Sequence, residues 1–290
     1  MTISRRAFLK LSGASLGAAL VAPVLPVQAA APQAIRAEKS ASMLYDSVKC
    51  VGCRACQSAC KRRAGLPAER DATGLFEAPT DLSANTWTLI KLYKGENVHS
   101  FVKNQCMHCI APACVAACPV GALEKLESGP VIYHAERCIG CRYCMNVCPF
   151  GVPKSQWDKA LPLIQKCDFC ADRQAKGEQP ACSEACPTGA LIYGTRKSML
   201  DTAHSRLDAD TTYAKHVYGE TEAGGTSMLY ISQVNYKALG FPELKDIDIP
   251  EITWPYMQAV PGVIAVMVTL STAIYLRTHR GLNGGNHKEA

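Results

Sequence analysis

Hydrophobic residues gather into two long runs, one near each end of the chain, with only short apolar stretches between them. The first run extends from Leu11 to Val27 and is rich in glycine and alanine. The second extends from Tyr256 to Leu276 and contains no charged residue. Runs of this kind are typical of targeting or membrane-spanning segments.

The central part of the chain shows short alternating runs that predict β-strands close to the cysteines. These runs are Met43–Val48, Thr86–Tyr93, Pro130–His134, Ala190–Gly194 and Met228–Ile231. Helical patterning is clearest over Arg196–Leu207, and residues 65–85, which include Pro67, Gly74 and Pro79, predict a surface loop. Elements this short supply little ordinary core. We therefore expect an α+β domain over residues 43–250 whose interior is organised around cofactors.

The N-terminal run has the flanks of a signal peptide. The basic sequence Ser4-Arg5-Arg6-Ala7-Phe8-Leu9-Lys10 precedes it, and small residues, Gln28-Ala29-Ala30-Ala31, follow it. The paired arginines resemble the twin-arginine export signal, which serves proteins that fold before export. We expect a signal peptide over residues 1–29, cleaved after Ala29, and a linker over 30–42. An ordinary secretory signal with two chance arginines is the alternative.

The C-terminal run predicts one transmembrane helix over residues 255–276. Aromatic residues stand at its ends, and basic residues follow it, namely Arg277, Arg280 and Lys288. The positive-inside rule places the tail, residues 277–290, in the cytoplasm and the main body on the outer side, at the periplasmic face of the inner membrane. A buried core helix is the alternative.

All sixteen cysteines lie between Cys50 and Cys186, in four groups of four. Group one is Cys50, Cys53, Cys56 and Cys60, and group two is Cys106, Cys109, Cys114 and Cys118. Group three is Cys138, Cys141, Cys144 and Cys148, and group four is Cys167, Cys170, Cys182 and Cys186. Group three has the C-x2-C-x2-C-x3-C-P spacing of bacterial ferredoxins, and group one lacks only the proline.

This spacing suits 4Fe–4S clusters. A C-x2-C-x2-C loop curls around one cluster, and the fourth cysteine, three residues on, faces another. Each group therefore gives three ligands to one cluster and one to its neighbour, so four groups predict four clusters. The near copies that begin Cys118-Pro, Cys148-Pro and Cys186-Pro indicate duplicated ferredoxin-like modules.

Two other uses of the cysteines are possible. Zinc sites also use C-x2-C pairs, but usually without the third C-x2-C step. Disulfides suit an exported chain, although four clustered quartets are an unusual disulfide pattern. No C-x2-C-H segment occurs, which excludes covalent c-type haem. His108 lies between Cys106 and Cys109, and we interpret it as a neighbour of a cluster rather than a ligand.

The charge of the chain fits anionic cofactors. The formal net charge is +6, and basic residues stand inside or beside the cysteine groups, among them Arg54, Lys61, Arg62, Arg63, Arg142 and Lys166. We interpret them as compensation for buried clusters rather than as a nucleic-acid surface. The sequence offers no nucleophile–base arrangement, so we expect a chain without catalytic residues.

These four quartets, in this order, resemble the four-cluster iron–sulfur subunits of membrane-bound respiratory oxidoreductases. The similarity extends from Met43 to Tyr230 and includes Gln105-Cys-Met-His-Cys109 and Cys141-Arg-Tyr-Cys-Met145. The resemblance implies four ligand sets. Set one is Cys50, Cys53, Cys56 and Cys186, and set two is Cys60, Cys167, Cys170 and Cys182. Set three is Cys106, Cys109, Cys114 and Cys148, and set four is Cys118, Cys138, Cys141 and Cys144.

Within this family the chain most resembles the subunits associated with periplasmic nickel–iron hydrogenases. Those subunits carry both a twin-arginine signal and a C-terminal membrane helix. The resemblance implies electron transfer between such a hydrogenase and a quinone-reactive membrane subunit. The same role beside a molybdenum enzyme, such as formate dehydrogenase, is the first alternative. A structural, zinc-binding exported protein is the second.

Overall fold

The computed structural model describes residues 37–68 and 81–283. The expected signal peptide, most of the linker, the centre of the 65–85 loop and the last residues of the tail lie outside this part of the chain. The chain divides into a body within Pro32–Ile252 and a second unit that contains the segment from Thr253 onward.

The body is built on a three-stranded sheet with the order β8-β1-β9. Strand β1 (Ala41–Asp46) pairs antiparallel with β8 (Leu191–Thr195) and parallel with β9 (Met228–Ile231). Leu44 therefore lies beside Ile192 on one side and Leu229 on the other. The sheet joins the segment before the first cysteine group to segments that follow the last one.

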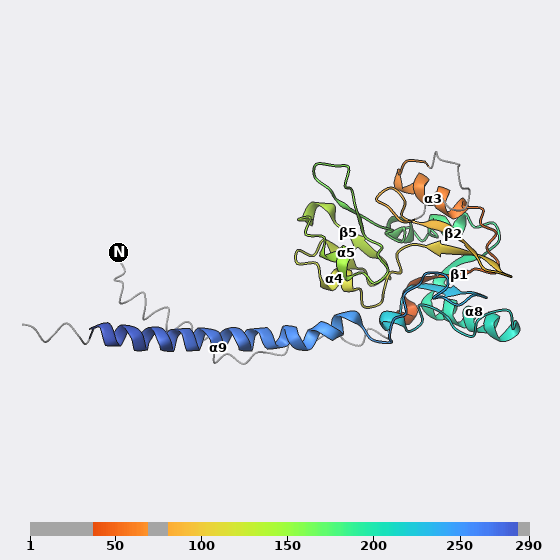
Figure 1. Cartoon of the computed structure of the whole chain (residues 1–290). Coiled ribbons are helices and arrows are strands. Elements are labelled where there is room, and N and C mark those ends of the chain that lie inside the picture. Colours follow the sequence, from red (N-terminus) through yellow and green to blue (C-terminus); the bar gives the residue numbers. More distant parts are fainter. Residues whose placement is uncertain (1–36, 69–80, 284–290) are drawn as a thin grey trace, which may run out of the picture. The chain divides into compact units, whose positions relative to one another are not determined.

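Helix α8 (Arg196–Ala209) covers one face of this sheet (Figure 1). The helix begins at Thr195, whose hydroxyl accepts a hydrogen bond of 3.2 Å from the Ser198 N–H. Its buried side chains pack on the sheet in an ordinary apolar core, which contains Leu44, Met199, Ala203, Leu207, Leu229 and Ile231.

The other face of the sheet looks toward the cysteines. Successive strand residues point to opposite faces, so Met43 and Tyr45 lie in a different core from Leu44. That second core contains the buried thiols Cys56 and Cys182. The sheet therefore separates an ordinary core from an interior lined by thiols.

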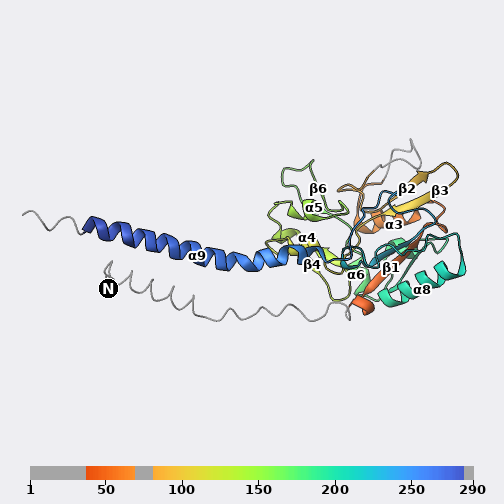
Figure 2. The same ribbon diagram turned by 60° about the horizontal axis from the view of Figure 1, so that its bottom comes forward.

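In the described part of the body, three hairpins and five short helices accompany this sheet and α8 (Figure 2). The hairpins are β2 (Leu89–Lys94) with β3 (His99–Asn104), β4 (Leu123–Lys125) with β5 (Val131–Tyr133), and β6 (Lys154–Ser155) with β7 (Ile164–Gln165). The helices are α3 (Ala55–Ala64), α4 (Ala113–Ala116), α5 (Tyr143–Val147), α6 (Ala171–Gln174) and α7 (Ala181–Glu184). Two 3-10 turns lie at Ala135–Arg137 and Glu222–Gly224.

The short helices carry cysteines and pair in a regular way. Helix α3 of group one packs against α7 of group four, and α4 of group two packs against α5 of group three. Groups one and four therefore approach each other, as do groups two and three.

The mixed helix and sheet architecture confirms the expected α+β class. Each of the five runs predicted as strands overlaps one, and α8 includes the predicted helix over Arg196–Leu207. Strands β3, β4, β6 and β7 were not predicted. Strands β6 and β7 have two residues each, which is too short for an alternating pattern to be visible.

The C-terminal segment forms α9, from Ile249 to Asn283, which Figure 1 draws as one continuous helix. Among the described residues it is the one helix long and apolar enough to cross a membrane, over Ile249–Thr278, and an 18-residue stretch of it has a mean hydropathy of 2.0. The hydroxyls of Thr269 and Thr272 each donate 2.8 Å hydrogen bonds to carbonyls four residues earlier. These hydroxyls are therefore satisfied within the helix, as an apolar environment requires.

Candidate functional site

All sixteen cysteines lie in the described part of the chain, and all are free thiols. The structure therefore does not use them as disulfides, and their burial varies. Cys53 and Cys141 are exposed, whereas Cys56, Cys60 and Cys167 are among those that are buried.

The cysteines that the resemblance assigns to set one surround a single cavity. Cys50, Cys53 and Cys56 line it from group one, and Cys186 lines it from group four. The cavity holds about 330 Å³ of space not filled by protein atoms, its mouth included. Tyr45 of the central sheet forms another part of the wall.

The cysteines assigned to set four surround a second cavity of the same size. Cys118 of group two lines it together with the first three cysteines of group three, Cys138, Cys141 and Cys144. Both cavities thus combine three thiols of one group with the last thiol of another.

The thiols assigned to set two raise one another's pKa, which indicates that they lie near each other. Burial raises the pKa of Cys60 to about 12, and the neighbouring Cys182 and Cys170 raise it as well. Burial also raises the pKa of Cys167, with Cys60 as the next cause. One thiol of group one therefore lies among three of group four.

The thiols assigned to set three also influence one another's ionisation. Burial raises the pKa of Cys109, and the charges of Cys106, Cys148 and Cys114 raise it further. Burial also raises the pKa of Cys114 to about 12, with Cys106 as the next cause. The fourth thiol comes from group three and the others from group two.

These sets fit 4Fe–4S clusters. Buried thiols that raise one another's pKa resist ionisation together unless a cationic core lies among them. In residues 37–68 and 81–283, no three His, Cys, Asp or Glu side chains gather closely enough to hold a single ion. Four thiols spaced around a cavity match a cluster better than a tetrahedral zinc site, whose ligand sulfurs lie about 2.3 Å from one ion.

Four loops share one backbone conformation. The residue before the second cysteine of each group has a positive φ: 70° at Gly52, 48° at His108, 72° at Gly140 and 60° at Phe169. Backbone N–H groups then turn toward sulfur, as Gly140 shows by donating to Cys138 Sγ at 3.4 Å. The repeated C-x2-C motif therefore corresponds to a repeated fold of the chain.

The Cys-Pro-x-Gly copies also share one turn. The N–H groups of Gly121, Gly151 and Gly189 each donate to the carbonyl of the preceding cysteine, and each glycine has a φ close to 60°. Burial opposes ionisation of Cys118, but backbone N–H groups of Val120–Leu123 outweigh it and lower the pKa of this thiol. The turn thus stabilises a thiolate.

Electrostatic effects between thiols of different sets follow one order. The charge of Cys56 acts on Cys182, which links set one to set two. The charge of Cys106 acts on Cys167, which links set two to set three. The charge of Cys144 acts on Cys114, which links set three to set four. The sets therefore follow one another from one to four, and the exposed Cys53 and Cys141 belong to the two ends.

Lys103 on β3 is a cation that the sequence did not reveal. It is fully buried, and its ammonium donates to the Thr88 hydroxyl. Burial acts to lower its pKa, but the charges of Cys56, Cys182 and two further thiols outweigh burial and raise the pKa. Lys103 thus lies between sets one and two. The only signal for it was its place just before group two, because a lysine in a short strand is normally exposed.

Two more lysines lie beside set three. Lys166, which the sequence placed next to group four, donates to the carbonyls of Val131 and Cys167. Lys125 on β4 donates to the His108 carbonyl at 3.1 Å. Burial lowers the pKa of Lys125 to about 8, against the opposing effect of Cys109.

Arg54 and Arg142 occupy matching places, directly after the second cysteines of groups one and three. Arg54 lines the cavity of set one, and Arg142 lines that of set four. Each has buried guanidinium nitrogen without a hydrogen-bond partner in the structure. Arg142 also lies over the Trp157 ring at 4.2 Å. Both arginines are thus in place to compensate negative charge, as the sequence suggested.

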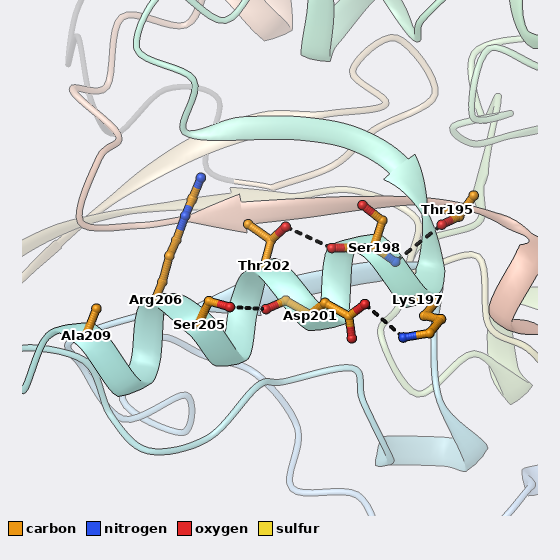
Figure 3. Close-up of a pocket in the computed structure, with 8 residues that line it drawn as sticks. All are labelled: Thr195, Lys197, Ser198, Asp201, Thr202, Ser205, Arg206 and Ala209. Carbon is orange, nitrogen blue, oxygen red and sulfur yellow. Dashed lines mark hydrogen bonds and ion pairs between the residues drawn. The ribbon is translucent and has the colours of Figure 1, made fainter.

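A broad hollow along the exposed side of α8 contains no cysteine (Figure 3). Its polar groups satisfy one another, as in the 2.9 Å ion pair between Lys197 and Asp201. We assign it no part in the chemistry.

Comparison with known proteins agrees with this geometry. Residues 97–196, which contain groups two to four, match the model of the 4Fe-4S dicluster domain. A protein of Nitratidesulfovibrio vulgaris is 40% identical over 287 residues, covering 96% of this chain and 78% of that protein.

Two relatives have informative names. The hydrogenase-2 operon protein HybA of Escherichia coli O157:H7 is 37% identical over 284 residues, covering 84% of this chain and 85% of that protein. The iron–sulfur subunit of nitrate-inducible formate dehydrogenase of Escherichia coli K12 is 37% identical over 210 residues, covering 69% and 71%. The fold and the thiol sets define a 4Fe–4S ferredoxin-type protein. The chain belongs to the family of iron–sulfur subunits that includes HybA and the formate dehydrogenase subunits.

Proposed function

We propose that this chain carries electrons through four 4Fe–4S clusters between a catalytic partner and the membrane. The observation that supports this most directly is the division of sixteen thiols into four neighbouring sets. Each set would hold one cluster, with the ligands that define sets one to four. The grouping of three thiols with one from another group also supports an origin by duplication of ferredoxin modules.

The bound clusters supply reversible one-electron chemistry, and the chain supplies their surroundings. Backbone N–H groups at the Cys-Pro-x-Gly turns stabilise thiolates, as the lowered pKa of Cys118 indicates. Lys103, Lys125 and Lys166 provide positive charge in the interior. The chain itself carries out no bond-making step, so it acts as a non-catalytic subunit.

The catalytic partner is, in our proposal, a periplasmic nickel–iron hydrogenase, and the electron acceptor is a quinone-reactive membrane subunit. Two observations favour a hydrogenase. HybA is 37% identical over 84% of this chain, whereas the formate dehydrogenase-O iron–sulfur subunit is 32% identical over 89% of it. The chain also combines a twin-arginine sequence with the apolar helix α9. The similarity to formate dehydrogenase subunits keeps a molybdenum partner as the second candidate.

The location follows from the two ends. We propose that residues 1–29 direct export by the twin-arginine route and that residues 30–42 are a linker. The body, 43–250, then lies at the periplasmic face of the inner membrane. Residues 255–276 of α9 span the bilayer, and residues 277–290 form a cytoplasmic tail.

Purification of the intact complex through a tag on this chain, followed by elemental analysis, tests the proposal. Four complete ligand sets predict about sixteen irons per chain. Nickel without molybdenum would support the hydrogenase partner, and molybdenum without nickel would replace it with the second candidate. Stoichiometric zinc, or iron near half the expected amount, would contradict the four clusters.

A further inference from the structure

Two of the four C-x2-C loops carry an aromatic residue where the others carry glycine. Glycine is the default at a positive φ, because a side chain there costs about 1–2 kcal/mol. Gly52 and Gly140 follow this rule, whereas His108 and Phe169 do not. A strained backbone conformation of this kind persists only where the surrounding structure enforces it, often at a functional site.

The two aromatic side chains stack on each other. The ring centroids of His108 and Phe169 are 4.4 Å apart, with an angle of 32° between the ring planes. His108 is 1% exposed and Phe169 is fully buried. His108 lies between two thiols of set three, and Phe169 lies between two thiols of set two. The stack therefore lies where the two middle sets meet.

The hydrogen bonds of His108 fix the position of its proton. The Val131 N–H donates to Nδ1 over 2.9 Å, so Nδ1 is an acceptor and carries no hydrogen. The ring is then neutral, with its hydrogen on Nε2. Nε2 is buried and has no hydrogen-bond partner in the structure. A buried donor left in this state costs about 1–3 kcal/mol, so Nε2 requires an acceptor that residues 37–68 and 81–283 do not supply.

We propose that the Nε2–H of His108 donates a hydrogen bond to a sulfur of the 4Fe–4S cluster held by set three. This inference rests on the proposed function. Set three is the natural acceptor because the backbone of His108 lies between its ligands Cys106 and Cys109. Lys125, which holds the His108 carbonyl, also acts on those two thiols. His108 is thus a positioning residue that tunes a cluster.

The consequence is a higher reduction potential for that cluster. Reduction adds one electron and no proton, and the reduced cluster is the more anionic form. A donor aimed at its sulfur stabilises that form more than the oxidised one. The third set would therefore be easier to reduce than the same loop with glycine at position 108.

The test compares His108→Gly with Phe169→Gly in the full chain within its complex. Positions 108 and 169 correspond to Gly52 and Gly140 in the other two loops. Glycine therefore suits the loop conformation in both variants. His108→Gly removes the donor and the stack, whereas Phe169→Gly removes only the stack. Redox titration followed by electron paramagnetic resonance measures each cluster, and chains labelled with 15N-histidine report coupling between a ring nitrogen and a reduced cluster.

The proposal expects a 15N coupling in the unsubstituted chain and in Phe169→Gly. In His108→Gly this coupling should be lost, and the reduction potential of one cluster should fall. Cys114→Ser, which alters set three, and Cys182→Ser, which alters set two, identify that cluster. A shift in set two would overturn the assignment, as would unchanged coupling in His108→Gly. If His108→Gly loses iron, His108→Ala takes its place, because alanine also lacks a side-chain donor and costs only about 1–2 kcal/mol at a positive φ. An unsubstituted chain without iron would instead refute the proposed function.

Discussion

Arg63 forms a two-pronged contact with Asp168, with its Nη1 2.7 Å from Oδ1 and 2.6 Å from Oδ2. Arg63 lies on α3, three residues after the last cysteine of group one. Asp168 lies between the first two cysteines of group four, and its Oδ1 also accepts the Cys170 N–H at 2.9 Å. The contact therefore joins the two segments that supply set two.

Arg63→Ala should weaken the binding of the cluster held by set two. The contact is half-buried, and a hydrogen bond to a charged group contributes about 1.5–3 kcal/mol. Burial acts to lower the pKa of Arg63, but the hydrogen bond and the charge of Asp168 outweigh burial and raise it. We expect about four of sixteen irons to be lost on exposure to air or mild chelation, measured as iron per chain.

Arg62→Ala is the matched control. Arg62 is exposed, and its Nη1 bonds only to the nearby Ser58 hydroxyl at 3.2 Å in the side-chain contacts described. Equal iron loss in the two variants would show that general loss of positive charge, rather than the link to Asp168, is responsible.

Lys103→Met should lower the reduction potentials of the clusters in sets one and two together. The ammonium of Lys103 acts on Cys56 and Cys182, which belong to different sets. Removing a buried positive charge disfavours the reduced, more anionic clusters. Redox titration of the purified complex measures the shift. Lys94→Met, at the exposed end of β2, is the control and should leave all four potentials unchanged.

The cysteine spacing and the alternating runs predicted several elements of this structure. The strand over Met228–Ile231 and helix α8 were visible because their patterns are local. The approach of Cys186 to Cys50 was not, since it depends on sheet pairing between β1 and β8, far apart along the chain. Family resemblance supplied that pairing where spacing alone could not.

Two buried groups of the interior escaped sequence reasoning for physical reasons. Lys103 reads as a surface residue, and only the thiols around it explain a charged side chain at 0% exposure. His108 was recognised as a neighbour of a cluster, but its stack on Phe169 joins two loops that are 61 residues apart and was not predictable from either motif.

Replacing Arg5 and Arg6 by lysine should trap the protein in the cytoplasm. The twin-arginine route reads the arginine pair itself, so lysine does not substitute although the charge is kept. Cell fractionation measures the location. Normal periplasmic accumulation of the double variant would indicate an ordinary secretory signal instead.

Truncation after Asp248 should separate membrane attachment from cluster binding. The last cysteine is Cys186, and α9 begins at Ile249. The shortened chain should keep its iron and leave the membrane fraction, and it should fail to couple to quinone reduction. Loss of iron would show that the helix is needed for the body to fold, and full quinone reduction would show that it is not needed for coupling.

Gly52→Ala should disrupt set one far more than Gly140→Ala disrupts set four. Both glycines have a φ near 70°, so alanine pays a similar backbone cost of about 1–2 kcal/mol at either position. The space around them differs. A Cβ at Gly52 would lie 2.3 Å from Cε1 of Phe101, whereas nothing lies within 4 Å of one at Gly140.

The Phe101 ring cannot yield freely to a methyl group at position 52. Phe101 packs against the core that contains Tyr45 and Cys56, and its carbonyl accepts the Tyr45 hydroxyl at 2.8 Å. Overpacking of this kind typically costs a further 1–3 kcal/mol, roughly. Iron per chain and the temperature of unfolding, measured for both variants, separate the two costs. Equal effects would mean that backbone strain alone governs the loops, and the close contact with Phe101 would then carry no weight.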